Sequence, residues 1–314
     1  MGNSFGKFGE FVPGYVVYEP ARKLVKEKLL EISMREEAQS STTSWARHAL
    51  ASDSGNLLDA IKRGFPVRLI ATFEPDLKTC NSDAALREVL EDREMGAFDH
   101  IPVHENSRAI GLLQRDSAVE EACETVRDAM APLDETNLIS AEDSVLSFIE
   151  TADKSPCRLV LDGRQIRGIV TLSDLQQLPV RPLLFLLVNF VELLLADLIR
   201  SLEIPEETWL ASLNDVRRSE VENKWQRLNC SNMAIDKLTA TEFADKKRIV
   251  HEQDGLPWSG KQFKKDMEKV QWLRDAVAHA GEYAATEENA LKTVATVRIC
   301  QHWIDTLRSY EPDN

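Results

Sequence analysis

The feature that most constrains this chain is a supersecondary pattern that occurs twice. Residues 100–116 have the sequence HIPVHENSRAIGLLQRD, and residues 158–174 have the sequence RLVLDGRQIRGIVTLSD. Each segment contains an apolar run, a polar turn and a second apolar run with a glycine in it, Gly111 or Gly168. A unit that repeats within one chain usually forms modules that pack against each other, so we expect a pair of modules here.

Helical patterns precede both segments. Residues 83–94 and 142–153 have the amphipathic spacing of helices. Ser140 and Asp143 match a capping box, which predicts a helix start at that point. An apolar run at residues 67–73 predicts an additional strand at the beginning of the first unit.

The sequence divides into an α/β part and an all-α part. Two modules are predicted over residues 66–125 and 126–180, with a helical adaptor over residues 1–65 before them. Beyond residue 180 only helical patterns occur, with a Gly-Leu-Pro break at residues 255–257. The predicted helices of the adaptor and of the tail span residues 19–37, 45–60, 181–203, 206–228, 231–252, 259–282 and 285–310. The expected fold class is α+β, with the module pair followed by an all-α domain over residues 181–314.

The most apolar predicted helix contains an uncharged run over residues 182–191. Glu192, Asp197 and Arg200 interrupt its continuation, well short of the roughly 20 apolar residues of a membrane span. A helix that is apolar around most of its circumference is normally buried on several sides. We therefore expect the central helix of a bundle or dimer, and no membrane partner.

Composition excludes several classes of protein. The net charge is −14 and both halves of the chain are acidic, so a nucleic-acid partner has to be bound by a local patch, and no DNA partner is predicted. The five cysteines include no CxxC pair, which indicates reduced thiols rather than a disulfide framework or a metal site. The N-terminus has no apolar signal core. These observations predict a cytoplasmic protein.

The residues of the repeat carry a resemblance to a known family. The strand at residues 102–103 and the Gly-Leu-Leu run from Gly111, together with residues 158–161 and 168–174, resemble CBS domains. The pair resembles a Bateman module over about residues 66–180. The resemblance implies a cleft between the modules that binds an adenosine-containing ligand, here AMP, ADP or ATP as a regulator.

The Gly-x-x-Thr-x-x-Asp string that ends the second unit suits a nucleotide. Thr171 lies where a strand gives way to a helix, so its hydroxyl can donate to a phosphate beside helix N-terminal N–H groups. On the resemblance, Asp174 accepts hydrogen bonds from the ribose hydroxyls, and Ile139 and Leu159 form walls for the adenine. The alternative interpretation is that Thr171 and Asp174 only cap a helix.

The first unit departs from this string. It has Gln114 in the place of Thr171 and Ser117 in the place of Asp174. Asp116 comes one position early, which turns it by about 100° around a helix and away from a ligand. We therefore predict one competent ligand site, in the second unit, and a degenerate site in the first.

A second motif lies in the penultimate predicted helix. Residues 272–281 have the sequence WLRDAVAHAG, in which His279 follows Arg274 by five positions. With the number and order of the helices, this motif resembles HEPN domains, whose ribonuclease members have an Arg, a polar residue and a His. The resemblance covers about residues 181–310 and puts Asp275 in the polar position. It implies a homodimer that cuts single-stranded RNA.

The chemistry of this motif needs no metal ion or other cofactor. Histidine titrates near neutral pH and can accept the proton of a 2′-hydroxyl, and arginine is a permanent bidentate donor for a phosphate. His279 and Arg274 are the expected catalytic pair, with Asp275 orienting the imidazole, because positions four apart share a helix face. The expected products are a 2′,3′-cyclic phosphate and a 5′-hydroxyl. The candidates for contact with the RNA are Lys261, Lys264 and Lys265.

The motif also allows interpretations without catalysis. Positions five apart point about 140° from each other on a regular helix, so one chain does not easily bring Arg274 and His279 to one phosphate. The helical part could mediate only dimerisation and recruit a partner protein. Arg274 and Asp275 could also form surface ion pairs, with His279 favoured at a helix end by the dipole. The two leading hypotheses are a nucleotide-regulated endoribonuclease and a non-catalytic nucleotide-sensing dimer.

Overall fold

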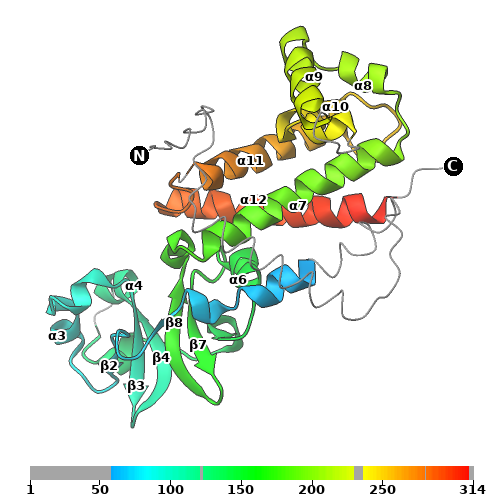
Figure 1. Cartoon of the computed structure of the whole chain (residues 1–314). Coiled ribbons are helices and arrows are strands. Elements are labelled where there is room, and N and C mark those ends of the chain that lie inside the picture. The colour runs from blue at the N-terminus through cyan, green and yellow to red at the C-terminus, as the bar shows by residue number, and fades with distance from the viewer. Residues whose placement is uncertain (1–57, 121–122, 230–235, 280, 311–314) are drawn as a thin grey trace, which may run out of the picture.

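The computed structural model describes residues 58–120, 123–229, 236–279 and 281–310. The predicted helix at residues 19–37 and most of the predicted adaptor lie outside these ranges. Figure 1 shows an α/β part at one end of the molecule and a helical part at the other. The predicted order, mixed α/β modules followed by helices, is confirmed.

The α/β part contains two four-stranded sheets. The first has the strand order β2-β3-β4-β5, and the second has the order β1-β8-β7-β6. Each sheet contains one parallel pair, β2 with β3 or β6 with β7, and its other pairs are antiparallel. The strands are β1 (Thr72–Phe73), β2 (Cys80–Asn81), β3 (His100–Glu105), β4 (Arg108–Gln114), β5 (Ala131–Pro132), β6 (Leu138–Ser140), β7 (Cys157–Asp162) and β8 (Gln165–Thr171).

Short helices accompany both sheets. The first sheet and its helices are called module one here, and the second sheet and its helices are called module two. The helices of module one are α3 (Leu86–Glu91), η2 (Met95–Ala97), α4 (Arg115–Glu120) and α5 (Val126–Ala129). Those of module two are η1 (Val67–Leu69), η3 (Glu135–Asn137), α6 (Val145–Thr151) and η4 (Leu172–Gln176), preceded by helical residues 58–64.

The chain crosses between the modules, so the sheets do not follow the predicted borders at residues 66 and 126. Strand β1 precedes module one in sequence but pairs with β8 of module two, with Phe73 opposite Gly168. Strand β5 pairs with β4 of module one, with Pro132 opposite Gly111. Module one is therefore continuous in sequence from β2 to β5, whereas module two contains β1 from before module one, and the sequence repeat does not reveal this arrangement.

The predicted strand at residues 67–73 is wrong for most of its length. Only Thr72–Phe73 is a strand, and Val67–Leu69 forms a turn of 3₁₀ helix. Val67 and Ile70 are both fully buried, and their separation of three positions is one turn of such a helix. A short apolar run fits either structure, and burial against module two selects the helical one.

The predicted helix start at Ser140 is also wrong. Ser140 ends β6 and pairs with Leu161 of β7, so its backbone is committed to the sheet. The Asp143 carboxylate accepts from the Ser140 N–H at 2.9 Å and closes a turn. The helix α6 begins later, with Ser144 as its N-cap, whose hydroxyl accepts from the Leu146 N–H at 3.2 Å.

The helical part is built around one long helix, α7. Helices α10, α11 and α12 pack against it. The predicted helix at residues 206–228 is two helices, because the Asn214 side chain accepts from the Arg217 N–H at 2.9 Å and starts a new helix there. The elements are α7 (Val180–Ser201), α8 (Glu206–Ala211), α9 (Asp215–Asn229), η5 (Lys237–Ala240), α10 (Phe243–His251), α11 (Gly260–Ala278) and α12 (Glu287–Ser309).

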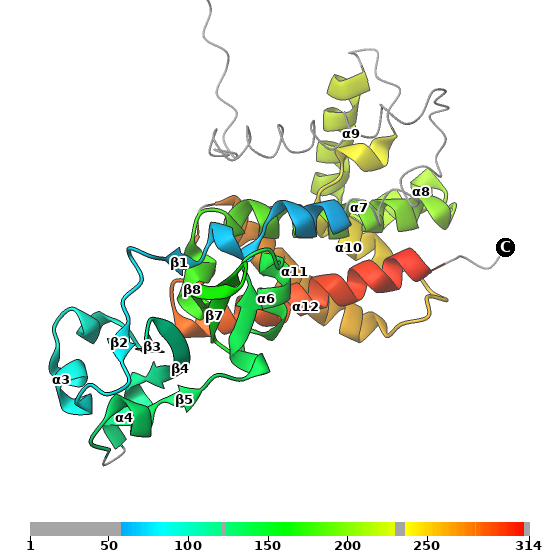
Figure 2. The ribbon, with the colours of Figure 1, turned by 90° about the horizontal axis from the view of Figure 1, so that it is seen from below.

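Module two and the helical part share one hydrophobic core. Buried side chains of helix 58–64, of β6 to β8 and of α6 belong to the same cluster as those of α7, α11 and α12. Module one has a smaller core of its own. In Figures 1 and 2 module one lies at the far end of the molecule, on the side of module two that faces away from α12. Module two is therefore the physical connection between module one and the helices.

Helix α7 has the length and apolar character of a membrane-spanning helix, and it is the one such helix among the described residues. About two thirds of its most apolar stretch, 67%, is buried inside the molecule. Its apolar side chains therefore have protein partners, as expected for the central helix of a bundle.

Candidate functional site

Module two ends in a turn that is held by Thr171 and Asp174. The Asp174 Oδ2 atom accepts from the Thr171 N–H at 2.6 Å and from the Thr171 hydroxyl at 3.0 Å. Its Oδ1 atom accepts from Gln177 Nε2 at 2.7 Å. Both residues therefore cap η4, as the alternative interpretation of the string requires. Since a carboxylate offers about four acceptor positions, three donors leave Oδ1 able to accept one more.

Asp174 lies in an apolar environment. Burial raises the pKa of its carboxyl above the ordinary value, while its hydrogen bonds to Thr171 and Gln177 act in the opposite direction. Cys157 lies opposite Thr171 in the β7–β8 pair. Burial, together with the charge of Asp174, raises the pKa of the Cys157 thiol to about 12. A further donor to Asp174 would therefore stabilise a charge that burial disfavours.

The two residues predicted as adenine walls lie on opposite faces of the second sheet. Leu159 is fully buried and packs with Leu112 of module one, on the face between the modules. Ile139 pairs with Val160 and packs in the large core toward α7. Because neighbouring strand residues alternate in direction, Ile139 and Leu159 do not form two walls of one cleft. The neighbour of Ile139, Leu138, is the side chain that shares a cluster with Leu159.

Gly168 allows β1 to lie against β8. A Cβ atom at this position would be 2.9 Å from the Phe73 ring and 3.0 Å from the Thr72 carbonyl oxygen. Gly111 likewise allows β5 to lie against β4 in module one, where a Cβ atom would be 2.6 Å from the Ala131 carbonyl oxygen. The two glycines of the repeat are therefore explained by the close approach of β1 to β8 and of β5 to β4.

The end of β4 in module one differs from the end of β8. Asp116 and Ser117 are exposed, and so is Gln114, whose Nε2 lies 3.4 Å from His100 Nε2. Arg115 turns inward and donates to backbone carbonyl oxygens, including that of Met95 at 3.3 Å. No carboxylate among these residues occupies a position like that of Asp174.

A cavity of about 220 Å³ lies at the other end of β8, near the β7–β8 turn. Asp162 lies 3.3 Å from Arg68 there, so opposite charges are already paired. Sequence analysis did not single out this group, because its members come from separate segments. The residues that line it are Arg68, Phe73, Glu74, Asp162 and Arg167.

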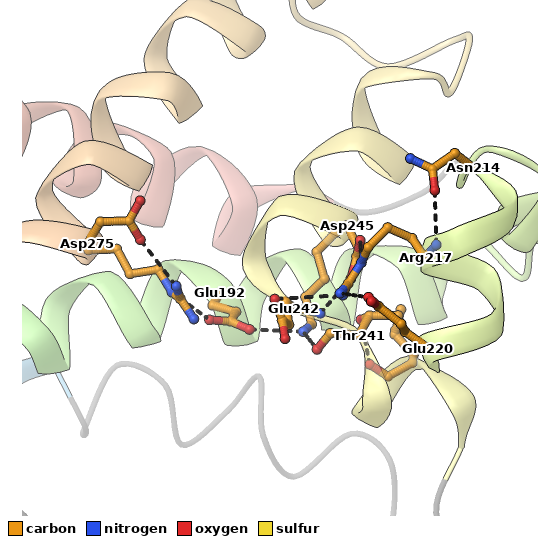
Figure 3. Close-up of polar contacts among 11 residues, drawn as sticks. Glu192, Asn214, Arg217, Glu220, Thr241, Glu242, Asp245 and Asp275 are labelled. Carbon is orange, nitrogen blue, oxygen red and sulfur yellow. Dashed lines mark hydrogen bonds and ion pairs between the residues drawn. The ribbon is translucent and has the colours of Figure 1, made fainter. Parts of the chain in front are cut away.

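Arg274 is held in the helical part by the carboxylates of Glu192 and Asp275, which are labelled in Figure 3. Its Nε atom lies 3.9 Å from Glu192 Oε2 of α7, and its Nη1 atom lies 3.4 Å from Asp275 Oδ1. The side chain is 21% exposed. His279 is exposed and forms the C-cap of α11. The Asp275 carboxylate contacts Arg274, and over the described part of the chain no hydrogen bond joins it to the His279 ring, contrary to the predicted role in orienting that ring.

Glu192 belongs to a buried polar network that sequence analysis did not predict. Lys246 of α10 is 6% exposed and donates to Glu192 Oε1 at 2.9 Å and to the Thr241 carbonyl oxygen at 2.9 Å. The sequence indicates that Glu192 needs a charged or polar partner, because it interrupts an apolar helix and a carboxylate removed from water has to be paired. The Lys246 partner, and the approach of Lys246 and Arg274 to different oxygen atoms of Glu192, come only from the fold.

The predicted RNA-contact lysines lie away from this network. All three are exposed in the first turns of α11, and Lys264 precedes Arg274 by ten positions, about 15 Å along the helix. Lys247 of α10 is closer in space, since its ammonium group donates to Gln271, one turn before Asp275. Burial lowers the pKa of Lys247. The three lysines at the start of α11 are Lys261, Lys264 and Lys265.

Within the described ranges, no group of three or more His, Cys, Asp and Glu side chains could hold a metal ion. The thiols of Cys80, Cys157 and Cys300 are buried.

No family model and no curated protein matches this chain. Among solved structures, the CBS domain of a bacterial CNNM/CorC family Mg²⁺ transporter in complex with ATP is 17% identical, with a TM-score of 0.34 over 42% of this chain and 95% of that chain. A hemolysin-like protein containing a CBS domain from Oenococcus oeni is 14% identical, with a TM-score of 0.32 over 38% and 93%. The CBS-pair protein CBSX2 from Arabidopsis thaliana is 13% identical, with a TM-score of 0.31 over 35% and 90%. These matches are to proteins with CBS domains and assign no activity to this chain.

Proposed function

We propose that this chain is a regulatory protein whose module pair binds an adenosine-containing ligand at Thr171 and Asp174. The Gly-x-x-Thr-x-x-Asp string and the resemblance of both units to CBS domains support this proposal. The observation that carries it is the position of Asp174, which caps η4 and lies six positions before Val180, where α7 begins. A ligand at Asp174 would therefore act on the first turn of the helix around which the helical part packs.

The chemistry of Asp174 suits a ribose. One hydroxyl can donate to the open position on Oδ1. A second hydroxyl that binds Oδ2 has to replace the Thr171 hydroxyl, which is then free to donate to a phosphate. Because hydrogen bonds to a charged group are stronger than neutral ones, an adenine nucleotide such as AMP, ADP or ATP gains affinity from this residue.

Calorimetric titration of the full chain tests this proposal. The panel is AMP, ADP, ATP, S-adenosylmethionine and a cyclic dinucleotide, each added to the wild type and to Asp174→Asn. We expect at least one adenosine compound to bind, and Asp174→Asn to weaken it by about tenfold or more. If no member of the panel binds the wild type, the proposal is wrong.

A second candidate function is metal-independent cleavage of single-stranded RNA by a homodimer. The observation that favours it is the setting of Arg274, because Glu192 orients the guanidinium while the side chain stays accessible. His279 lies exposed at the end of the same helix and would act as the base for the 2′-hydroxyl. Arg274 and His279 are five positions apart on α11 and therefore point in different directions. In a dimer, the motifs of both chains would line one cleft and so bring an arginine and a histidine to the same phosphate.

Cleavage of labelled single-stranded RNA in the presence of EDTA tests the second candidate. His279→Ala should lower the rate by about 100-fold or more, the usual contribution of a general base. His302→Ala is the matched control, because His302 is an exposed histidine on the adjacent helix α12. If the wild type leaves RNA intact with and without adenine nucleotides, the nucleotide-sensing dimer that recruits a partner protein becomes the preferred hypothesis.

A further inference from the structure

The segment around η4 contacts the turn that follows His279. Gln176, the last residue of η4, accepts from the Ala284 N–H at 3.0 Å through its Oε1 atom. Arg181, in the first turn of α7, donates to the Gly281 carbonyl oxygen at 3.1 Å, and its guanidinium lies 5.3 Å from the centre of the Tyr283 ring. Two side chains that follow Asp174 by two and seven positions therefore hold residues 281–284, which we call the 281–284 turn.

The second half of the 281–284 turn is buried, and its first residue, Gly281, is tightly fitted. Tyr283 is 0% exposed and Ala284 is 4% exposed. The Gly281 N–H donates to the Ala276 carbonyl oxygen at 2.8 Å, and a Cβ atom on Gly281 would be 3.1 Å from that oxygen. A buried N–H group that loses its acceptor has no water to replace it. The Ala284 N–H therefore depends on Gln176.

Asp174 holds the beginning and the end of the same short helix. Through Oδ2 it binds Thr171, and through Oδ1 it binds Gln177, whose Nε2 also donates to the Ile70 carbonyl oxygen at 2.6 Å. Because Oδ2 already accepts from two donors, a ribose that binds both oxygens has to displace one of them. Gln177 adjoins Gln176 in sequence, so a change in this hydrogen-bond set reaches the contact with Ala284.

We infer that η4 links the two candidate sites, so that a ribose bound at Asp174 loosens the Gln176 contact with Ala284 and thereby frees the 281–284 turn beside His279. This inference rests on the proposed function for its ligand. The link through η4 is a property of the chain itself and is measurable without a ligand.

Hydrogen exchange of the full chain, followed by mass spectrometry, tests the link. Gln176→Leu removes the acceptor and should speed the exchange of amides in residues 281–286 by about tenfold, the effect of one lost hydrogen bond. Gln176→Glu keeps an acceptor and should stay near the wild type. Gln165→Leu is the matched control, because Gln165 is an exposed glutamine of module two that accepts only from Arg167. Unchanged exchange of β3 amides in every variant shows that the fold is intact.

The decisive variant is Asp174→Asn, measured without ligand. It removes acceptor positions from η4 and should speed the exchange of residues 281–286 by about threefold. The double variant with Gln176→Leu should exchange no faster than Gln176→Leu alone, because both act through one contact. If Asp174→Asn leaves the exchange of this segment as in the wild type, the inference is overturned.

AMP is the ligand probe, with its binding measured separately by calorimetry. AMP should speed the exchange of residues 281–286 in the wild type and leave it unchanged in Gln176→Leu, although both proteins bind AMP. Bound AMP that leaves the wild-type exchange unaltered contradicts the inference. If AMP does not bind, the adenosine compound that does bind in the calorimetric panel is the probe instead; if none binds, the ligand proposal is wrong, and the ligand-free variants still decide whether η4 is a link.

Discussion

Modules one and two share a strand order and differ in what each packs against. Module one has its own small core, and the helix that follows β4, α4, contains the exposed Val119. Module two continues through η4 into α7 and shares its core with the helical part. The same supersecondary unit is therefore a nearly separate module in one place and part of a larger cooperative unit in the other. The residues after each repeat glycine, rather than the repeat itself, make this difference.

The largest expected effect concerns the two cores. Phe148→Ala, in the shared core, should cost about 3–5 kcal/mol, and Leu113→Ala, in module one, about 2–5 kcal/mol. The Phe148 variant should speed hydrogen exchange in α7 and α12 as well as in module two, because one core connects them. The Leu113 variant should affect residues 80–132 alone. If the α7 amides of the Phe148 variant exchange as slowly as those of the wild type, module two does not unfold together with the helical part, and the account of a shared core is contradicted.

The next comparison uses the two repeat glycines. Gly111→Ala and Gly168→Ala should each destabilise the protein by about 1–3 kcal/mol, since a Cβ atom at these positions clashes with β5 and β1, respectively. Gly111→Ala should cost more, because its nearest neighbour is a backbone oxygen at 2.6 Å, whereas the ring of Phe73 beside Gly168 can turn. Urea unfolding of both variants measures the difference. A neutral effect at either position would contradict the close approach of the strands.

A smaller effect is expected at the polar contact between module two and α12. Arg298 donates to the Glu150 carbonyl oxygen at 2.6 Å and to the Asp153 carboxylate at 2.8 Å. Arg298→Ala should cost about 1 kcal/mol at neutral pH, since the pair is partly exposed. Arg87→Ala, which breaks an exposed pair within α3 of module one, should cost less.

The contact between Arg298 and Asp153 also predicts a pH dependence. The hydrogen bond from Arg298 lowers the pKa of Asp153 below its ordinary value. The contribution of this hydrogen bond to stability is therefore present above the ordinary pKa of an aspartate. It is lost as the pH falls through the lowered pKa that Asp153 has in the folded protein. The difference in unfolding free energy between wild type and Arg298→Ala should shrink over that acidic range. A constant difference down to pH 2 would contradict the ion pair.

Sequence patterns predicted the architecture better than its connections. The repeat, the helical tail and the break near residues 255–257 follow from local periodicity, and the structure contains all of them. The pairing of β1 with β8 and of β5 with β4 did not follow, because two-residue strands carry too little pattern to show which sheet they join. The same limit misplaced the helix start at Ser140, where pairing with Leu161 overrides the capping signal.

At the candidate sites, too, the sequence predicted local contacts and missed contacts between distant segments. The capping chemistry of Thr171 and Asp174 was visible in the sequence as one of two interpretations. The partners of Arg274 were not, because Glu192 lies 82 positions earlier and is brought to it by the packing of α7 against α11. Ile139 was misassigned since β6 is too short to reveal which face of the sheet each residue occupies. Local chemistry was predictable, and long-range partners required the fold.

The central claim is that module two holds the single competent ligand site of the chain. Calorimetry of the adenosine compound that binds the wild type tests it most directly, with Asp174→Ala compared with loss of the carboxylate that lies one position earlier in module one, Asp116→Ala. The account predicts one ligand per chain, its loss in Asp174→Ala, and unchanged affinity in Asp116→Ala. Two ligands per chain, or an equal loss in Asp116→Ala, would contradict it.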